Sequence, residues 1–313
     1  MYIVQTEKLS KTYDNFTAVQ DVTLRVAPNE IYGFLGPNGA GKTTTILMLL
    51  GIEKPTSGNI MLFGDSLSEN AFEIKRRLGV VAEHQSFYDD MTAREYLNFF
   101  GRFYRVENVK QRIETLLEMV SLRDFGNARA RDFSRGMQQK LGLIRALLHD
   151  PELLILDEPV SALDPGGVIE IRHLLLEQAK QGRTIFISSH ILSEVEQTAD
   201  RIGILNKGQL IVDASLDTIR RQLQPYMDLE IELHHVSPGL VQAVGALDFV
   251  HEISNFANQL SLKVDADSDH RADLSRFITS QGGIIVNMST KEMSLEEAFV
   301  TITEQNVSRL FGE

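Results

Sequence analysis

The sequence contains no cysteine among its 313 residues. This absence excludes disulfides, thiolate metal ligands and a cysteine nucleophile, and it is compatible with a reducing cytosol. The sequence also lacks any apolar run near the roughly 20 residues that a membrane helix needs. The N-terminal segment MYIVQTEKLSKTYDN contains no apolar signal core. If the protein acts at a membrane, we expect other chains to span it.

Basic residues are fewer than acidic ones. The 31 Lys and Arg against 43 Asp and Glu give a formal net charge of -12. This charge disfavours extended binding to nucleic acid or to an anionic membrane surface, so we expect no nucleic-acid partner. The chain length suggests about two domains.

Short apolar runs alternate with helical patterns up to about residue 215, which is typical of an α/β layer fold. Six of these runs are expected to be strands: Ile31–Leu35, Val80–Ala82, Leu153–Leu156, Thr184–Ser188, Ile202–Leu205 and Leu210–Val212.

The stretch between the second and third predicted strands shows only helical patterns. Thr92 and Glu95 form the capping-box pattern of a helix through EYLNFFGRFY. A second helix is expected over Val109–Met119, and a third from FSRG to Leu148. We therefore expect an inserted helical subdomain at about residues 85–150, with a role of its own.

The pattern changes past Ala214. A short helix is expected after Ser215, ending near QLQPY. The segments MDLEIEL, NQLSLKV and GGIIVNM then alternate apolar and polar residues, as half-buried antiparallel strands do. Helical segments are expected between them, and Ser294 with Glu297 forms the capping box of a last helix. We place a domain boundary near residues 214–226 and expect a small α+β interaction or regulatory module after it.

The segment GPNGAGKT, from Gly36 to Thr43, has the form G-x-x-x-x-G-K-[ST]. Its glycines allow successive backbone N–H groups to face phosphate oxygens. Lys42 then reaches the β and γ phosphates, and the Thr43 hydroxyl ligates Mg²⁺. The alternative is a glycine-rich turn that matches by accident. The apolar strand before it and the helical pattern after it favour a nucleotide site.

Two acidic residues end the apolar segment LLILDEP. Asp157 is expected to hold Mg²⁺, and Glu158 to act as general base or to orient the attacking water. The pair could instead be polar residues that merely end a strand, but a phosphate loop in the same sheet favours the catalytic interpretation. His190 follows another predicted strand, where ligands of parallel sheets bind, and could hydrogen-bond the γ-phosphate. A lone histidine is otherwise more often structural.

A second anion site is expected at FSRGMQQK. Ser134 and Gly136 lie at a predicted helix start, where free N–H groups and the helix dipole favour an anion. Further along, Asp164 followed by Pro165 has the pattern of an N-cap with proline at the first helical position.

The motifs and their order along the chain resemble the ATPase subunit of ATP-binding cassette (ABC) transporters over roughly residues 3–215. GPNGAGKT corresponds to the Walker A loop, LLILDEP to Walker B, SALD to the D-loop, His190 to the switch histidine and FSRGMQQK to the signature LSGGQQQR. The resemblance implies an α/β fold with a P-loop NTPase (ABC ATPase) core. Residues 1–215 would form this nucleotide-binding domain with its helical subdomain, and residues 216–313 a C-terminal accessory or regulatory α+β domain.

The resemblance also implies a head-to-tail dimer, in which the signature of one copy covers the γ-phosphate held by the Walker A loop of the other. Tyr13 matches the aromatic residue that stacks on adenine, although a half-buried strand residue is the alternative. The implied catalytic residues are Lys42, Glu158 and His190. The implied ATP-binding residues are Tyr13, Gly36, Pro37, Asn38, Gly39, Ala40, Gly41, Lys42, Thr43, Thr44, Ser134, Gly136 and Asp164.

The sequence departs from the family pattern at two places. Arg135 and Met137 replace the first glycine and the first glutamine of the signature. The glutamine that precedes the helical subdomain falls by register on Glu83, with Gln85 as the alternative. A carboxylate at this position could still ligate Mg²⁺ or its water, so Thr43, Asp157 and Glu83 are the expected metal ligands.

We therefore expect an ATPase that energises a transporter, with ATP and Mg²⁺ as cofactors. The segments REYLNFFGRFY and SLEEAF resemble a bacterial exporter branch whose membrane subunits are separate chains. The expected partners are a second copy and integral membrane permease subunits, and the expected location is the cytoplasmic face of the cell membrane.

Three other functions compete with this one. One is a soluble cassette protein that acts on ribosomes or DNA. Such proteins usually have two cassettes or a long coiled-coil insertion, and often basic surfaces, whereas this chain has one cassette, no long heptad run and an acidic balance. A GTPase is suggested by NKGQ at Asn206–Gln209, but the guanine-reading Asp is absent and Asn-Lys-Gly fits a hairpin turn better. A purely regulatory nucleotide binder is disfavoured by Glu158.

Overall fold

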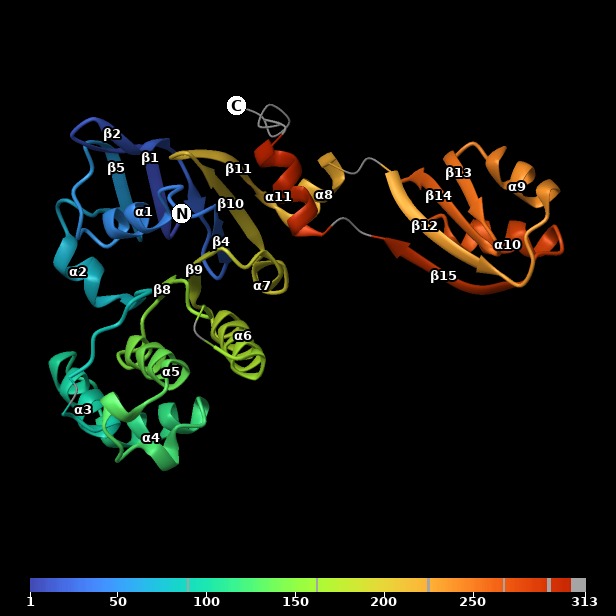
Figure 1. Cartoon of the computed structure of the whole chain (residues 1–313). Coiled ribbons are helices and arrows are strands. Elements are labelled where there is room, and N and C mark those ends of the chain that lie inside the picture. Colours follow the sequence, from blue (N-terminus) through green and yellow to red (C-terminus); the bar gives the residue numbers. More distant parts are fainter. Residues whose placement is uncertain (89, 162, 224–225, 267, 292–293, 305–313) are drawn as a thin grey trace. The chain divides into compact units, whose positions relative to one another are not determined.

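The computed structural model describes the chain except for residues 89, 162, 224–225, 267, 292–293 and 305–313 (Figure 1). The chain divides into two compact units, Met1–Ser215 and Leu216–Glu313.

A six-stranded sheet forms the centre of the first unit, in the order β11-β10-β4-β9-β8-β7. The five strands from β10 to β7 are parallel to one another, and β11 pairs antiparallel with β10. All six predicted strands are present with slightly shifted ends: β4 (Ile31–Leu35), β7 (Leu78–Val81), β8 (Leu153–Asp157), β9 (Thr184–Ser189), β10 (Arg201–Asn206) and β11 (Gln209–Ser215). Because β4, β8 and β9 are buried along their whole length, their sequences are continuously apolar rather than alternating.

A second, antiparallel sheet was not predicted. It consists of β1 (Val4–Tyr13), β2 (Phe16–Val22), β3 (Arg25–Val26), β5 (Ser57–Leu62) and β6 (Asp65–Ser66). Its buried residues share one hydrophobic core with helix α1 (Lys42–Leu49) and with Tyr32 and Phe34 of the central sheet. The short helix α2 (Ala71–Arg76) follows this sheet and was also not predicted.

The helical block lies between β7 and β8 and contains α3 (Ala93–Phe103), α4 (Val109–Met119) and α5 (Arg135–Ala146) (Figure 1). The predicted capping box of α3 is present, because Thr92 and Glu95 exchange hydrogen bonds between side chain and backbone. Helix α4 has the predicted bounds, whereas α5 ends before the predicted Leu148. These helices share a second hydrophobic core with β8 and with α6 (Pro165–Lys180). The short helix α7 (Leu192–Glu196) follows β9.

The hairpin between β10 and β11 has the geometry that its sequence predicts. Lys207 and Gly208 both have positive φ, at 48° and 81°, as a two-residue turn between paired strands requires. Asn206–Gln209 is therefore a turn and not a guanine-binding segment.

The second unit contains a four-stranded antiparallel sheet in the order β13-β14-β12-β15. Three strands were predicted, namely β12 (Tyr226–Leu233), β14 (Gln259–Asp265) and β15 (Ile285–Lys291). Strand β13 (Val250–Phe256) was missed because only its Val250 and Ile253 lie in the core, so apolar and polar residues alternate weakly. Helices α9 (Pro238–Gly245) and α10 (Arg271–Ser280) complete this core.

Two further helices belong to the second unit. Helix α8 (Leu216–Leu223) contacts α11 (Leu295–Glu304). Helix α11 has the predicted capping box, since Ser294 Oγ accepts from Glu297 N and the Glu297 carboxylate accepts from Ser294 N.

In the described part of the chain, no helix has both the length and the apolar character needed to cross a membrane.

Candidate functional site

The glycine loop joins β4 to α1 at the carboxyl edge of the central sheet. Gly41 has φ 107°, which favours glycine, and a Cβ at this position would overlap the carbonyl oxygen of Ala18. Among the described side chains, none caps the first turn of α1. The free N–H groups of that turn, together with the helix dipole, form an anion site. Pro37, Asn38 and Gly39 are exposed at its mouth.

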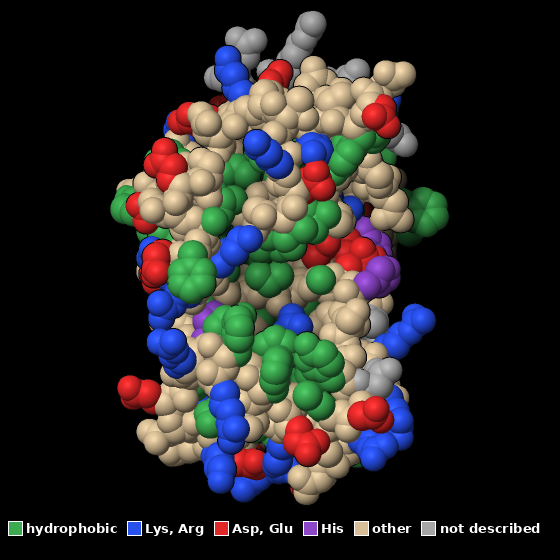
Figure 2. Space-filling view, turned by 90° about the vertical axis from the view of Figure 1, so that its left-hand side faces the viewer, with side chains coloured by type: hydrophobic (Ala, Val, Ile, Leu, Met, Phe, Trp, Pro, Cys, Tyr) green, Lys and Arg blue, Asp and Glu red, His purple; other side chains and the backbone are tan. Residues whose placement is uncertain are grey.

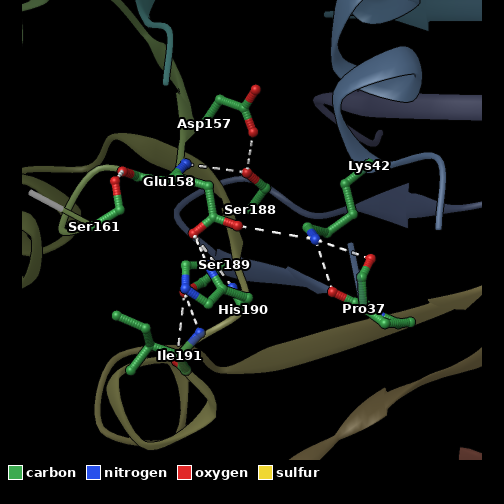
Figure 3. Close-up of polar contacts among 10 residues, drawn as sticks. Pro37, Lys42, Asp157, Glu158, Ser161, Ser188, Ser189, His190 and Ile191 are labelled. Carbon is green, nitrogen blue, oxygen red and sulfur yellow. Dashed lines mark hydrogen bonds and ion pairs between the residues drawn. The ribbon is translucent and has the colours of Figure 1, made fainter. Parts of the chain in front are cut away.

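Lys42 is buried beneath this loop. Its Nζ donates to Gly36 O at 2.7 Å and to Pro37 O at 3.4 Å (Figure 3). Its neighbours differ in exposure, since Thr43 is exposed and Thr44 half-buried. The ammonium group and the Thr43 hydroxyl therefore lie at the start of α1, where phosphate and metal would meet.

Asp157 and Glu158 end β8, as predicted, and Ser188 of β9 connects them. Ser188 Oγ donates to Asp157 Oδ1 and lies 3.2 Å from the Glu158 N–H, which donates to it. Asp157 and Ser188 are aligned as neighbours in the two parallel strands, and both are almost fully buried. This serine was not singled out from the sequence. Its register opposite Asp157 is the signal that could have identified it.

Glu158 is the centre of the site. Its φ of 50° is unusual for a residue other than glycine and costs about 1 kcal/mol or more. Its Oε1 lies 3.9 Å from Lys42 Nζ, and its Oε2 lies 2.7 Å from His190 Nδ1 (Figure 3). The His190 N–H also donates to Oε2, at 3.3 Å. The structure thus brings together the three predicted catalytic residues, from the ends of three strands or their following loops.

The signature segment begins a helix, as predicted. Ser134 is the N-cap of α5, and its Oγ accepts from Met137 N at 3.2 Å. Ser134 is exposed and Gly136 half-buried. Within the described residues, no hydrogen bond or ion pair joins Ser134 to the loop Gly36–Thr43 of the same chain. The hydrogen bond of Ser134 that the structure shows is thus made to its own helix α5.

Asp164 and Pro165 have the predicted capping geometry. Asp164 Oδ1 accepts from Gly167 N at 2.8 Å at the start of α6, with Pro165 at the first helical position. Tyr13 is the last residue of β1 and is 41% exposed, with Lys11 Nζ 4.8 Å from its ring centroid. The Tyr13 ring is therefore more open to solvent than the half-buried alternative suggested.

Glu83 and Gln85 lie after β7 in different surroundings. Glu83 is exposed. Gln85 is half-buried, and its Nε2 donates to Gln139 Oε1 of α5 at 3.1 Å. The two candidates for the family's glutamine position therefore differ: the Gln85 amide contacts α5, whereas the Glu83 carboxylate is exposed to solvent just after β7.

The parallel sheet, the glycine loop between β4 and α1 and the acidic end of β8 define a P-loop nucleotide-binding fold. A family model described as ABC transporter matches residues 19–161.

Relatives match almost the whole chain. The chain is 38% identical over 308 residues to the uncharacterized ABC transporter ATP-binding protein YcbN of Bacillus subtilis (strain 168), with 97% of this chain and 98% of that protein covered. It is 40% identical over 301 residues to the bacitracin transport ATP-binding protein BcrA of Bacillus licheniformis, with 96% and 97% covered.

A solved structure matches about two thirds of the chain. It is the dimeric, post-hydrolysis structure of the ATP-binding cassette MJ0796 bound to ADP and Pi, with a TM-score of 0.63 and 25% identity over 68% of this chain and 98% of that chain. The protein belongs to the ABC transporter family. It is an ATP-binding subunit, an ATPase whose hydrolysis of ATP drives transport.

Proposed function

We propose that residues 1–215 form the nucleotide-binding domain and that Glu158 is its general base. The single observation that supports this best is the buried Glu158 carboxylate between Lys42 Nζ, at 3.9 Å, and His190 Nδ1, at 2.7 Å (Figure 3). A carboxylate beside a phosphate-binding lysine can accept the proton of the attacking water. Lys42 balances charge on the β and γ phosphates, and His190 hydrogen-bonds the γ-phosphate. The backbone and side chains of Gly36–Thr44 hold the remaining phosphate oxygens.

The residues at this edge also fit Mg²⁺. This ion prefers oxygen ligands and usually keeps several waters, so one or two protein ligands and the phosphates suffice. Asp157 supplies a carboxylate that is only 4% exposed at the end of β8, and Thr43 supplies an exposed hydroxyl on α1. Glu83, exposed after β7, would bind the ion or one of its waters. A site of this kind needs no cluster of three His, Asp or Glu residues, and the described residues contain none. Bound Mg²⁺ would balance charge on the β and γ phosphates.

ATP is held between two copies of the chain. Ser134 and Gly136 lie at the start of α5, and among the described residues neither is hydrogen-bonded to the glycine loop of its own chain. The related cassette MJ0796 has a solved dimeric structure. The signature of one copy therefore covers the γ-phosphate of the other, with Asp164 beside it and the exposed Tyr13 ring stacked on adenine. Hydrolysis removes the γ-phosphate contacts and the dimer opens.

A groove beside the helical block receives the membrane subunit. It measures about 330 Å³ and is lined by residues of α2, β7, α3, α5 and the segments that follow α1, α3 and α5, including Val80, Phe100, Tyr104 and His149. Hydrophobic side chains gather in the middle of the face on which α2 and α3 lie (Figure 2). Burial lowers the pKa of His149, which favours the neutral form of this lining residue. Exposed apolar surface of this kind marks interaction sites, and the helical block would transmit closure through it.

The proposed location of the protein follows from its membrane partner. The subunit is bound to the cytoplasmic face of the membrane through the permease subunits, and residues 216–313 form an accessory or regulatory domain. Similarity to a bacitracin transport protein over nearly the whole chain supports export of an antibiotic.

Co-expression tests the proposed function. The chain is produced with the membrane protein encoded next to it and purified through a tag on that protein. We expect copurification and Mg²⁺-dependent ATP hydrolysis that rises when the complex is placed in lipid. Hydrolysis that is independent of Mg²⁺ would contradict the proposed metal site. Failure to copurify would contradict the proposed partnership with this membrane protein.

A further inference from the structure

The ring of His190 has few contacts of its own. Its side chain is 50% exposed, and among the described residues the ring makes one hydrogen bond, at 2.7 Å from Glu158 Oε2 (Figure 3). One hydrogen bond leaves a half-exposed ring free to turn. The place of the ring therefore depends on the backbone that carries it.

That backbone leads directly into a very short helix. Ser189 and Ile191 flank His190, and Ile191 N donates to Ser189 Oγ at 2.9 Å. Helix α7 begins at the next residue and spans only Leu192–Glu196. A helix of one turn is not stable on its own, so its contacts with the rest of the first unit set its position.

One of these contacts is apolar. Val195 is buried and packs against Gly33 of β4, where an added Cβ would lie 2.3 Å from Val195 Cγ1. This packing holds α7 against the central sheet. Because apolar contacts are non-directional, it does not by itself fix the direction in which the helix points.

The second contact is a forked ion pair between α6 and α7 (Figure 1). Arg172 Nη2 donates to both carboxylate oxygens of Glu194, at 2.8 and 2.6 Å, and Arg172 Nε donates to Oε2 at 3.1 Å. The two side chains are 18% and 20% exposed. A planar guanidinium that meets a carboxylate through several hydrogen bonds fixes orientation as well as distance. The pair therefore supplies the direction that the apolar contact lacks.

The ion pair also adjoins the backbone of the candidate site. It lines a small cavity of about 20 Å³, whose wall includes Pro159 and Ser189. Pro159 directly follows Glu158, and Ser189 directly precedes His190. A change in the geometry of the pair is thus felt next to both catalytic side chains.

We propose that Arg172 and Glu194 are positioning residues for His190. By fixing the direction of α7, the pair keeps the His190 ring at the Glu158 carboxylate. The inference rests on the proposed function, in which His190 hydrogen-bonds the γ-phosphate. Loss of the pair slows hydrolysis through His190 alone and leaves ATP binding intact, because the glycine loop and Lys42 remain in place.

Arg172→Met tests the pair, because it keeps the length of the side chain and removes both the charge and the fork. Glu194→Gln removes the charge on α7. Glu152→Gln is the matched control, since Glu152 accepts a similar forked bond from Arg77, at 2.6 and 2.7 Å. Glu152 precedes β8, at the amino end of the strand, whereas the candidate site lies at the carboxyl end.

The full chain of each variant is measured for kcat and for the Kd of ATP, and kcat is measured again in a His190→Ala background with radiolabelled ATP. We expect Arg172→Met and Glu194→Gln each to lower kcat about 3- to 30-fold, as residues that act through a network do, with little change in Kd. In the His190→Ala background the same changes should leave kcat close to that of the parent, because the group that the pair positions is absent. Glu152→Gln should match the wild type.

A purely structural ion pair would lower the thermal midpoint while kcat per folded molecule stayed at the wild-type value, and that result would overturn the inference. Equal losses of kcat with and without His190 would also overturn it, because the pair would then act on another group. If Arg172→Met does not fold, Glu194→Gln decides alone. A His190→Ala parent as active as the wild type would contradict the proposed role of His190 itself, whereas a slow parent with normal kcat in the pair variants would contradict only the positioning role.

Discussion

Glu158 Oε1 lies 3.9 Å from Lys42 Nζ, and the two side chains are only 6% and 8% exposed. Glu158 directly follows β8 and Lys42 begins α1, which follows β4; in the sheet, β9 lies between β4 and β8. A buried charge that loses its partner is strongly destabilising. The two groups therefore belong to one charged unit, in which each side chain balances the charge of the other.

Glu158→Gln keeps the size of the side chain and removes the base. We expect ATP to bind, hydrolysis to fall by about two orders of magnitude or more, and the ATP-bound dimer to persist. Steady-state phosphate release and size-exclusion chromatography with ATP measure the two effects. Near-normal turnover in a preparation free of contaminating ATPase would remove Glu158 from the chemistry.

Lys42→Ala deletes the charge-assisted contact to the β and γ phosphates. Such bonds are stronger than neutral ones, so we expect weaker ATP binding rather than slower chemistry alone. Calorimetric titration measures the affinity. Lys180→Ala serves as control, because that lysine is 71% exposed on α6 and pairs only with Glu177 among the described carboxylates. Equal affinity in the two variants would contradict the assigned role.

Ser188→Ala tests the residue that the sequence did not single out. It removes the hydroxyl that donates to Asp157 and accepts from the Glu158 N–H. Hydrogen bonds to charged groups contribute about 1.5–3 kcal/mol, so we expect the Mg²⁺ concentration for half-maximal hydrolysis to rise by about tenfold or more. A titration of activity with Mg²⁺ at saturating ATP measures this. An unchanged midpoint would show that Asp157 holds its position without the serine.

A chain that ends at residue 225 retains every proposed phosphate ligand. We expect ATP affinity to stay within a few-fold of the full chain and dimer lifetime to change. Circular dichroism establishes that the shortened chain is folded before titration. If the folded short chain bound no nucleotide, the boundary between the nucleotide-binding and accessory domains would be wrong.

The central parallel sheet could be predicted because its strands are buried on both faces and appear as continuous apolar runs, as in Leu153–Asp157. The N-terminal antiparallel sheet could not. Strand β1 mixes buried and exposed positions with a bulge between Leu9 and Lys11, which breaks the strict alternation that identifies a strand. Helix starts were predicted well, because Thr92, Ser134, Asp164 and Ser294 all bond to the helices that they cap.

The site was predicted one residue at a time, whereas its connections depend on the fold. Lys42, Asp157, Glu158 and His190 were recognised from motifs. Ser188 and the contact of Gln85 with Gly142 depend on strand register and helix packing, which no local pattern contains.

The central claim is that the signature of one copy faces the phosphate loop of the other. The chain contains no cysteine, so Asn38→Cys with Ser134→Cys introduces two thiols without background reaction. Both positions are exposed, and a short bifunctional thiol reagent tolerates more separation than a disulfide, whose Cα atoms must lie within about 7 Å. In a Glu158→Gln background, ATP with Mg²⁺ should give a covalent dimer on a denaturing gel, and omission of nucleotide should abolish it. Bands that remain monomeric, or that dimerise equally with and without ATP, would contradict a shared ATP site.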